Sequence, residues 1–186
     1  CYPLIFETNL KTLVWGTERW VVSGVTGSES VVANGSLKGK TLTDVVNGDA
    51  EAMLGAAVVS KYGSQLPLLA KIIDARQDLS IQVHPNDEMA KREHGKMGKS
   101  EMWYIIDADP GARLLVGFSR SISAEEYRQR VADGTITEVL ASHPVKPGDV
   151  FYLPAGRVHA IGGGIRLAEI QQSSDVTYRI YDYGRL

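Results

Sequence analysis

The sequence lacks several features that mark whole classes of protein. It has one cysteine, Cys1, which excludes an internal disulfide framework, so nothing points to an oxidising compartment. The formal net charge is −2, which gives no support for binding to nucleic acids or membrane surfaces. No apolar run approaches the ~20 residues that cross a bilayer, and no signal peptide is visible. The default expectation is a cytoplasmic protein.

Turn-forming residues are plentiful. Nineteen glycines and seven prolines divide the chain into short segments, which favours an all-β fold with a few short helices. A chain of 186 residues can bury one sizeable core, so a single domain is expected. Strands are predicted at 19–23, 30–32, 68–74, 79–83, 101–107, 112–116, 143–145, 149–153, 165–171 and 176–181. Helices are predicted at 41–54, with a break at Asn47-Gly48, and at 86–94 and 123–133, with a helical turn from Thr135.

Four potential metal ligands stand in predicted strands or turns. Gln82 and His84 close a strand that Pro85 ends, and period-two alternation places both side chains on one face. Glu101 begins another strand, and His159 follows a turn, a short strand and a second turn. Such nitrogen and oxygen donors fit zinc, and also iron or manganese. Either histidine alone could instead be a turn residue bonded to main-chain carbonyls; their joint occurrence favours the metal.

Two cationic residues suggest chemistry beside that site. Lys99 precedes Glu101 by two residues and should share its face, where a nearby metal would suit the lysine to proton transfer. A solvated lysine at a strand end is the alternative. Arg179 lies in a predicted strand, and if its face lines a cavity it can bind a phosphate or an oxyanion. A surface salt bridge is the alternative there.

Several segments together resemble a known family. Gly148-Asp-(x)4-Pro-x-Gly-(x)2-His159 is similar to the second motif of the cupin superfamily. The segments at 79–87, 98–104, 154–160 and 168–179 resemble motifs of the type I phosphomannose isomerases. No single motif is specific, but the resemblance runs from Tyr2 to nearly the last residue. Gln82 stands where a plain cupin more often has histidine, which separates the isomerase pattern from the common one.

The resemblance implies a fold and an activity. The fold would be a cupin-type jelly-roll β-barrel, a single catalytic domain over 1–186 with helical insertions at 86–95 and 123–142. The activity would be metal-dependent interconversion of mannose 6-phosphate and fructose 6-phosphate through a cis-enediol, with one divalent ion, foremost zinc. The small-molecule partner would be a sugar phosphate. Relatives carry a longer loop near 16–17 and further β-structure, so a missing loop and missing β-structure after 186 are expected.

The resemblance also implies the roles of individual residues. The implied metal ligands are Gln82, His84, Glu101 and His159. The implied catalytic residues are Arg179, Lys99, Glu169 and Asp175. The implied substrate-binding residues are Glu18, Lys71 and Ser80.

Two other functions use the same residues. A cupin oxygenase would use His84, Glu101 and His159 as a two-histidine, one-carboxylate iron site. Gln82 argues against it, because it fills a position that such sites leave open for oxygen. A non-catalytic sugar-binding cupin would keep the metal without turnover, and the presence of Lys99 and Arg179 argues against that reading. Metal analysis and a turnover assay separate the three.

Overall fold

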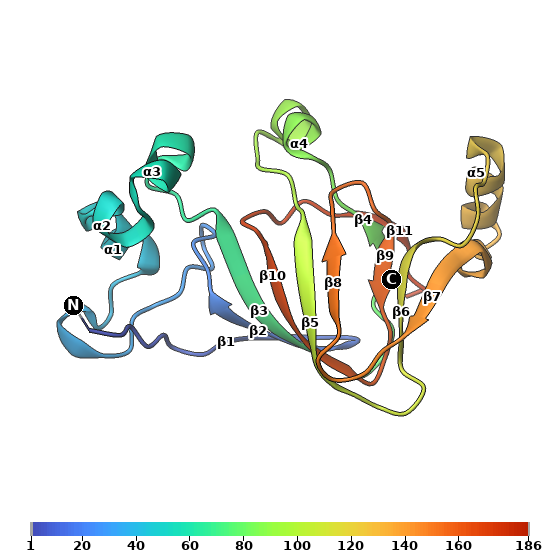
Figure 1. Cartoon of the computed structure of the whole chain (residues 1–186), viewed down its shortest axis with the longest axis horizontal. Coiled ribbons are helices and arrows are strands. Elements are labelled where there is room, and N and C mark those ends of the chain that lie inside the picture. Colours follow the sequence, from blue (N-terminus) through green and yellow to red (C-terminus); the bar gives the residue numbers. More distant parts are fainter. Residues whose placement is uncertain (1, 186) are drawn as a thin grey trace.

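The computed structural model describes residues 2–185, which form two antiparallel sheets (Figure 1). The first sheet has the order β1 (Asn9–Leu13), β2 (Gly16–Val22), β3 (Leu68–Ala75), β10 (Ile165–Gln172), β5 (Glu101–Ala108), β8 (Val150–Leu153). The second has the order β11 (Tyr178–Tyr181), β4 (Ile81–Val83), β9 (His159–Ile161), β6 (Arg113–Phe118), β7 (Leu140–Pro144). The prediction of a mainly β fold of cupin jelly-roll type is confirmed.

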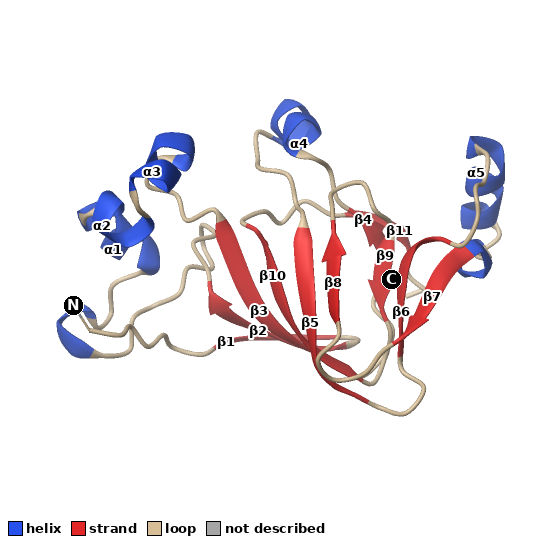
Figure 2. Cartoon of the chain, viewed as in Figure 1, coloured by secondary structure: helices blue, strands red, loops and turns tan. Residues whose placement is uncertain are grey.

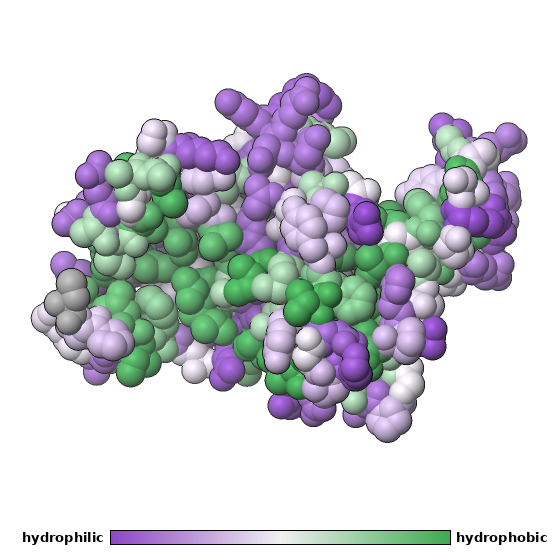
Figure 3. Space-filling view, in the orientation of Figure 1, coloured by the Kyte–Doolittle hydropathy of each residue, from purple (hydrophilic) through white to green (hydrophobic). Residues whose placement is uncertain are grey.

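Short helices lie around these sheets (Figure 2). They are α1 (Leu42–Gly48), α2 (Ala50–Leu54), α3 (Ala56–Tyr62), α4 (Asp87–His94) and α5 (Ala124–Ala132), with 3-10 turns at Gly35–Leu37 and Ile136–Val139. The first three gather at one end of the molecule, and α5 stands at the other. Hydrophilic side chains dominate the surface of α4, while hydrophobic ones are frequent over the strands below it (Figure 3). In the described residues, no helix has the length and apolar character to cross a membrane.

Alternating side chains build the core. Every second residue is buried along β10 and, from Glu101 to Ile105, along β5, as expected for strands with one face on a core. Trp103, Ile105 and Leu167 from the first sheet are fully buried and pack in one cluster with Leu114 and Ile161 from the second. Burying one such aliphatic side chain contributes about 1.5–3 kcal/mol. The two sheets therefore share one core between their inner faces.

The inner faces change from apolar to polar along the strands. The inner positions of β10 run Ile165, Leu167, Glu169 and Gln171, all buried. Antiparallel pairing sets Gln171 opposite Glu101 at the start of β5. Polar side chains therefore gather at the end of the sheet where β5 begins and β10 ends, and this end holds the candidate site.

Some predicted elements were wrong. The segment 30–32 forms only isolated bridges, Val31 with Thr41 and Val32 with Phe6. By contrast, the break predicted at Asn47-Gly48 in the helix 41–54 is confirmed, because α1 ends at Gly48 and the Asp49 side chain caps α2. Strands β1 and β9 and helix α3 were not predicted. The three residues of β9 are too few to display alternation.

Candidate active site

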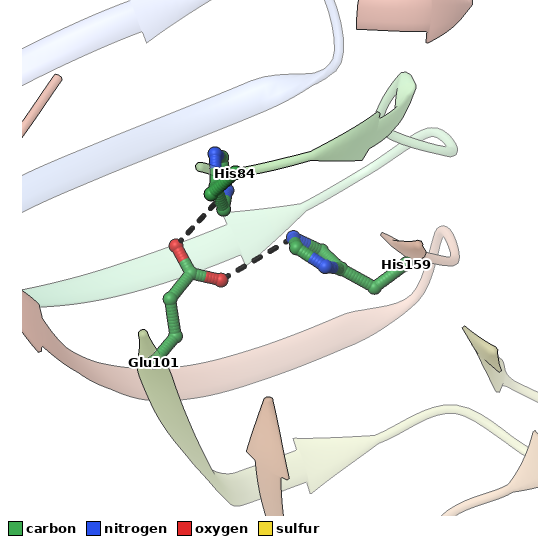
Figure 4. A group of neighbouring side chains, drawn as sticks. All are labelled: His84, Glu101 and His159. Carbon is green, nitrogen blue, oxygen red and sulfur yellow. Dashed lines mark ion pairs between the residues drawn. The ribbon is translucent and has the colours of Figure 1, made fainter. Parts of the chain in front are cut away.

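Three buried side chains from three segments meet between the sheets. His84 follows β4, Glu101 begins β5 and His159 begins β9, and each is 2% exposed. The Glu101 carboxylate lies between the two rings, with one oxygen towards each (Figure 4). His84 Nε2 lies 3.3 Å from Oε1, and His159 Nε2 lies 3.3 Å from Oε2. One ligand atom from each residue falls within 4.8 Å of the others.

Local sequence explains how His84 is presented. Pro85 lacks the N–H group that would continue β4, and Asn86 caps α4 by accepting from the Met89 amide at 2.9 Å. The chain therefore turns directly after His84. The main-chain carbonyl of His84 also accepts from the Gly156 amide at 2.8 Å, which ties it to the loop before His159.

Hydrogen bonds set the form of both imidazoles. His84 Nδ1 lies 3.0 Å from the Val176 carbonyl, and His159 Nδ1 lies 2.8 Å from the Arg157 carbonyl. A carbonyl only accepts, so each Nδ1 carries the proton, and Nε2 of the neutral ring presents a lone pair. Burial lowers the pKa of His159 to about 4, which keeps that ring neutral at pH 7. Both lone pairs point towards Glu101.

The cluster has the donor set that a cation requires. Both carboxylate oxygens of Glu101 and Nε2 of His159 are buried without a hydrogen-bond partner among the described residues. His159 Nε2 and Glu101 Oε2 are thus two acceptors 3.3 Å apart, an arrangement that is unfavourable unless positive charge lies between them. Two imidazole nitrogens and a carboxylate fit zinc, and also iron or manganese. The residues present therefore fit a divalent ion.

Lys99 supplies positive charge at the edge of the cluster. Its ammonium group lies 2.8 Å from Glu101 Oε1, where the two groups form an ion pair without hydrogen-bond geometry. The same group lies 3.2 Å from His84 Nε2. Burial opposes ionisation of Glu101, but the positive charge of Lys99 favours it, and the pKa of Glu101 lies well below its ordinary value. Glu101 is therefore an anion at neutral pH.

A second polar group lies on the inner face of the first sheet. Lys71 Nζ is 3.4 Å from Glu18 and 3.3 Å from Glu169. Burial alone would lower the pKa of Lys71, but the two carboxylates outweigh burial and raise it above the ordinary value. Glu169 also accepts from the indole of Trp103 at 2.9 Å, and Glu18 from that of Trp20 at 2.7 Å. Neither tryptophan was predicted as a site residue, yet their indole N–H groups hold these carboxylates in place.

Gln82, Arg179 and Ser80 lie along the second sheet. Gln82 pairs with His159 on one side and with Arg179 on the other, so the three side chains share one face. Arg179 is exposed and donates from Nε to the Ser80 hydroxyl at 3.2 Å. Within residues 2–185 no carboxylate pairs with this guanidinium, which leaves it available to an anion.

Asp175 is not brought into the cluster. Its side chain is 53% exposed and forms an ion pair with Lys96 at 2.6 Å, a contact that lowers the pKa of Asp175.

Beside His84, a cleft of about 370 Å³ opens, lined also by Met89, Arg92, Gly156 and Tyr178. The cleft residues of α4 were not predicted, because only the folded chain shows which side chains of the helix line the cleft.

Comparison with known proteins gives the same family. A sequence model of the catalytic domain of phosphomannose isomerase type I matches residues 12–110. The mannose-6-phosphate isomerase ManA of Bacillus subtilis is 42% identical over 200 residues, covering 98% of this chain and 62% of ManA. The mannose-6-phosphate isomerase of Streptococcus mutans is 40% identical over 200 residues, covering 98% and 61%.

A solved structure agrees with the sequence relatives. The crystal structure of mannose 6-phosphate isomerase from Bacillus subtilis superposes with a TM-score of 0.90 at 35% identity, over 99% of this chain and 62% of that one. The chain thus spans about three-fifths of the length of the relatives it matches. From the matched domain and these identities, the chain belongs to the type I phosphomannose isomerases.

Proposed function

We propose that this chain carries the catalytic machinery of a metal-dependent aldose–ketose isomerase, which interconverts mannose 6-phosphate and fructose 6-phosphate through a cis-enediol. The observation that supports it most is the buried acceptor cluster of His84, Glu101 and His159, in a chain 42% identical to a named mannose-6-phosphate isomerase. The two sheets share one core, which supports a single catalytic domain.

The proposed ion is zinc, held by Gln82, His84, Glu101 and His159. When bound, it would act as a Lewis acid on the oxygens of the reacting carbons. Gln82 would contribute its amide oxygen, since its side chain shares a face with His159. The neutral form of His159 at pH 7 supports this role, because an imidazole must be unprotonated to be a ligand.

Proton transfer between C1 and C2 needs a group that can move a proton at the edge of the site. Lys99 is placed for this task, since its ammonium group lies within 3.2 Å of His84 and Glu101. Glu169 is a second candidate, held on the inner face by Trp103 and Lys71. Asp175 could take part only if its ion pair with Lys96 opened.

Anion binding falls to Arg179. Arg179, with only the Ser80 hydroxyl as a partner in the described residues, would steady the phosphate or the enediolate. Lys71, Glu18 and Ser80 would position the sugar through their polar atoms. Neither the oxygenase nor the non-catalytic sugar-binding cupin is favoured by the relatives.

A direct assay tests the proposal. Mannose 6-phosphate is added to the purified protein, and fructose 6-phosphate is followed with and without a chelator. We expect turnover that the chelator abolishes and that added zinc restores. Turnover that survives complete metal removal would contradict metal dependence, and no turnover by the zinc-loaded protein would contradict the activity.

A further inference from the structure

The segment that follows β10 is irregular, yet three of its five residues are buried. Residues 173–177 join β10 to β11 without regular secondary structure, although Ser173, Ser174 and Val176 are 8%, 4% and 8% exposed. Buried main-chain carbonyls outside a sheet have no ladder partners and must find other donors. The partners of this segment therefore decide its conformation.

The Gln171 side chain supplies one of those donors. It is 1% exposed on the inner face of β10, and Nε2 lies 2.8 Å from the carbonyls of Gln172 and Ser174. Both partners only accept, so the amide nitrogen must face them. The inner positions nearer the start of β10, Ile165 and Leu167, are apolar, and burying an amide there would be costly without such partners.

The far end of the same segment contacts a candidate metal ligand. The Val176 carbonyl accepts Nδ1–H of His84 at 3.0 Å, and this bond fixes the tautomer that presents Nε2 to Glu101. Ser174 connects the two ends, because its carbonyl accepts from Gln171 while its hydroxyl lies 3.4 Å from the Val176 amide. A continuous path of hydrogen bonds thus leads from Gln171 to His84.

We infer that Gln171 is a positioning residue for the divalent cation site, acting on His84 through this segment and the Val176 carbonyl. The metal ion in this inference rests on the proposed function, whereas the hydrogen bonds between Gln171 and His84 do not. Without the Gln171 amide, the buried Ser174 carbonyl loses its donor, although the Gln172 carbonyl keeps the Ser174 amide at 2.8 Å. The segment then relaxes, and the Val176 carbonyl no longer holds the His84 ring in one tautomer and orientation.

The test uses Gln171→Met, which keeps the length of the side chain and removes both donors. Leu69→Met is the matched control, since Leu69 is the cross-strand partner of Gln171 and is also 1% exposed. In the metal-free protein, nitrogen NMR of the histidine rings reports the His84 tautomer. We expect the Nδ1–H form in the wild type and in Leu69→Met, and a mixture of tautomers in Gln171→Met.

The second readout is zinc affinity, measured by competition with a chromogenic chelator. We expect zinc to bind Gln171→Met about 10-fold more weakly than the wild type, the lower end of the loss seen for outer partners of metal ligands. Leu69→Met should bind zinc as the wild type does. Should Gln171→Met fail to fold, Gln171→Asn decides, because its shorter amide cannot reach both carbonyls and should shift both readouts in the same direction.

Two outcomes separate the inference from the proposed function. A folded Gln171→Met or Gln171→Asn protein with the wild-type tautomer and zinc affinity would overturn the positioning role. A wild-type protein that takes up no zinc would overturn the metal site, and the ring spectra of the metal-free protein would still decide whether Gln171 orients His84.

Discussion

His84 and His159 show what residue patterns predict and what they leave open. Period-two alternation predicts that His84 shares a face with Gln82. The tautomers could not be predicted, because they depend on carbonyls of Val176 and Arg157 that only the folded chain brings to the rings. Because each Nδ1 donates its proton to one of these carbonyls, each unprotonated Nε2 faces Glu101.

The lowered pKa of His159 predicts a loss of stability in acid. Its pKa is about 4 in the folded protein against an ordinary value of 6.5, so between these values the unfolded chain binds a proton that the native protein does not. Stability should therefore fall as pH decreases from 6.5 to 4, by up to about 3 kcal/mol from this residue, with no contribution above pH 6.5. Urea unfolding of the metal-free protein at pH 7 and pH 4.5 measures the loss.

The comparison variant is His159→Gln, which cannot bind that proton. It should lose less stability than the wild type between the two pH values, because carboxylates elsewhere titrate equally in both proteins. An equal loss in the two proteins would show that His159 is not the group responsible.

Arg179 is expected to serve the reaction and not the fold, since it is exposed and bonded to one hydroxyl. Lysine keeps the charge but lacks the planar fork that grips two oxygens. Arg179→Lys should therefore keep its stability and lose turnover by roughly 10²–10³-fold, the effect of removing one preorganised oxyanion donor. Steady-state kinetics checks this, and a loss confined to KM would place Arg179 on the phosphate.

Arg166→Lys is the control for that change, because Arg166 is exposed on β10 and pairs with Asp74 away from the cluster. It should retain normal kinetics. Near-normal kcat/KM in a folded, metal-loaded Arg179→Lys protein would mean that the arginine contacts no substrate oxygen.

At the scale of elements, strands with strong alternation were predictable and short ones were not. The predicted strands 68–74, 101–107 and 165–171 appear as β3, β5 and β10, each with alternating burial. The segment 30–32 was predicted as a strand, but its residues form only isolated bridges. Tertiary pairing, which the local pattern does not contain, decides such segments.

The segment 98–100 carries Lys99 and is held from three sides. The Lys99 amide donates to the Pro85 carbonyl at 3.0 Å, and the Ser100 amide donates to Gln172 Oε1 at 2.8 Å. The Gly98 amide donates to Asp87 at 2.8 Å, and a Cβ at Gly98 would lie 2.5 Å from the Asp87 nitrogen. Only glycine permits this approach of the segment to α4.

Gly98→Ala should therefore displace Lys99. We expect lower thermal stability and a kcat reduced at least 10-fold. Displacing a catalytic group by about 1 Å can lower the rate about 10²-fold. Gly48→Ala is the control, since its added Cβ meets nothing within 4 Å and its φ is not positive. That variant should match the wild type. Full activity of Gly98→Ala would show that the segment can shift without consequence.

At the scale of the whole molecule, the cluster is assembled from both sheets. Glu101 comes from the first sheet, while His84 and His159 lie at β4 and β9 of the second. Spacing in the sequence cannot show that these segments face each other; the resemblance to a family supplied that expectation. The same resemblance placed Asp175 in the pocket, whereas the structure shows it exposed and paired with Lys96.

We expect this junction of the two sheets to bind one divalent ion, and zinc titration of the metal-free protein measures that binding. Wild-type protein should bind one zinc per chain, and Glu101→Gln, which removes the anion between the rings, should bind it at least 100-fold more weakly. Glu125→Gln, the same change at an exposed position on α5, should bind as the wild type does. Equal zinc affinity in wild-type and Glu101→Gln proteins would contradict this expectation.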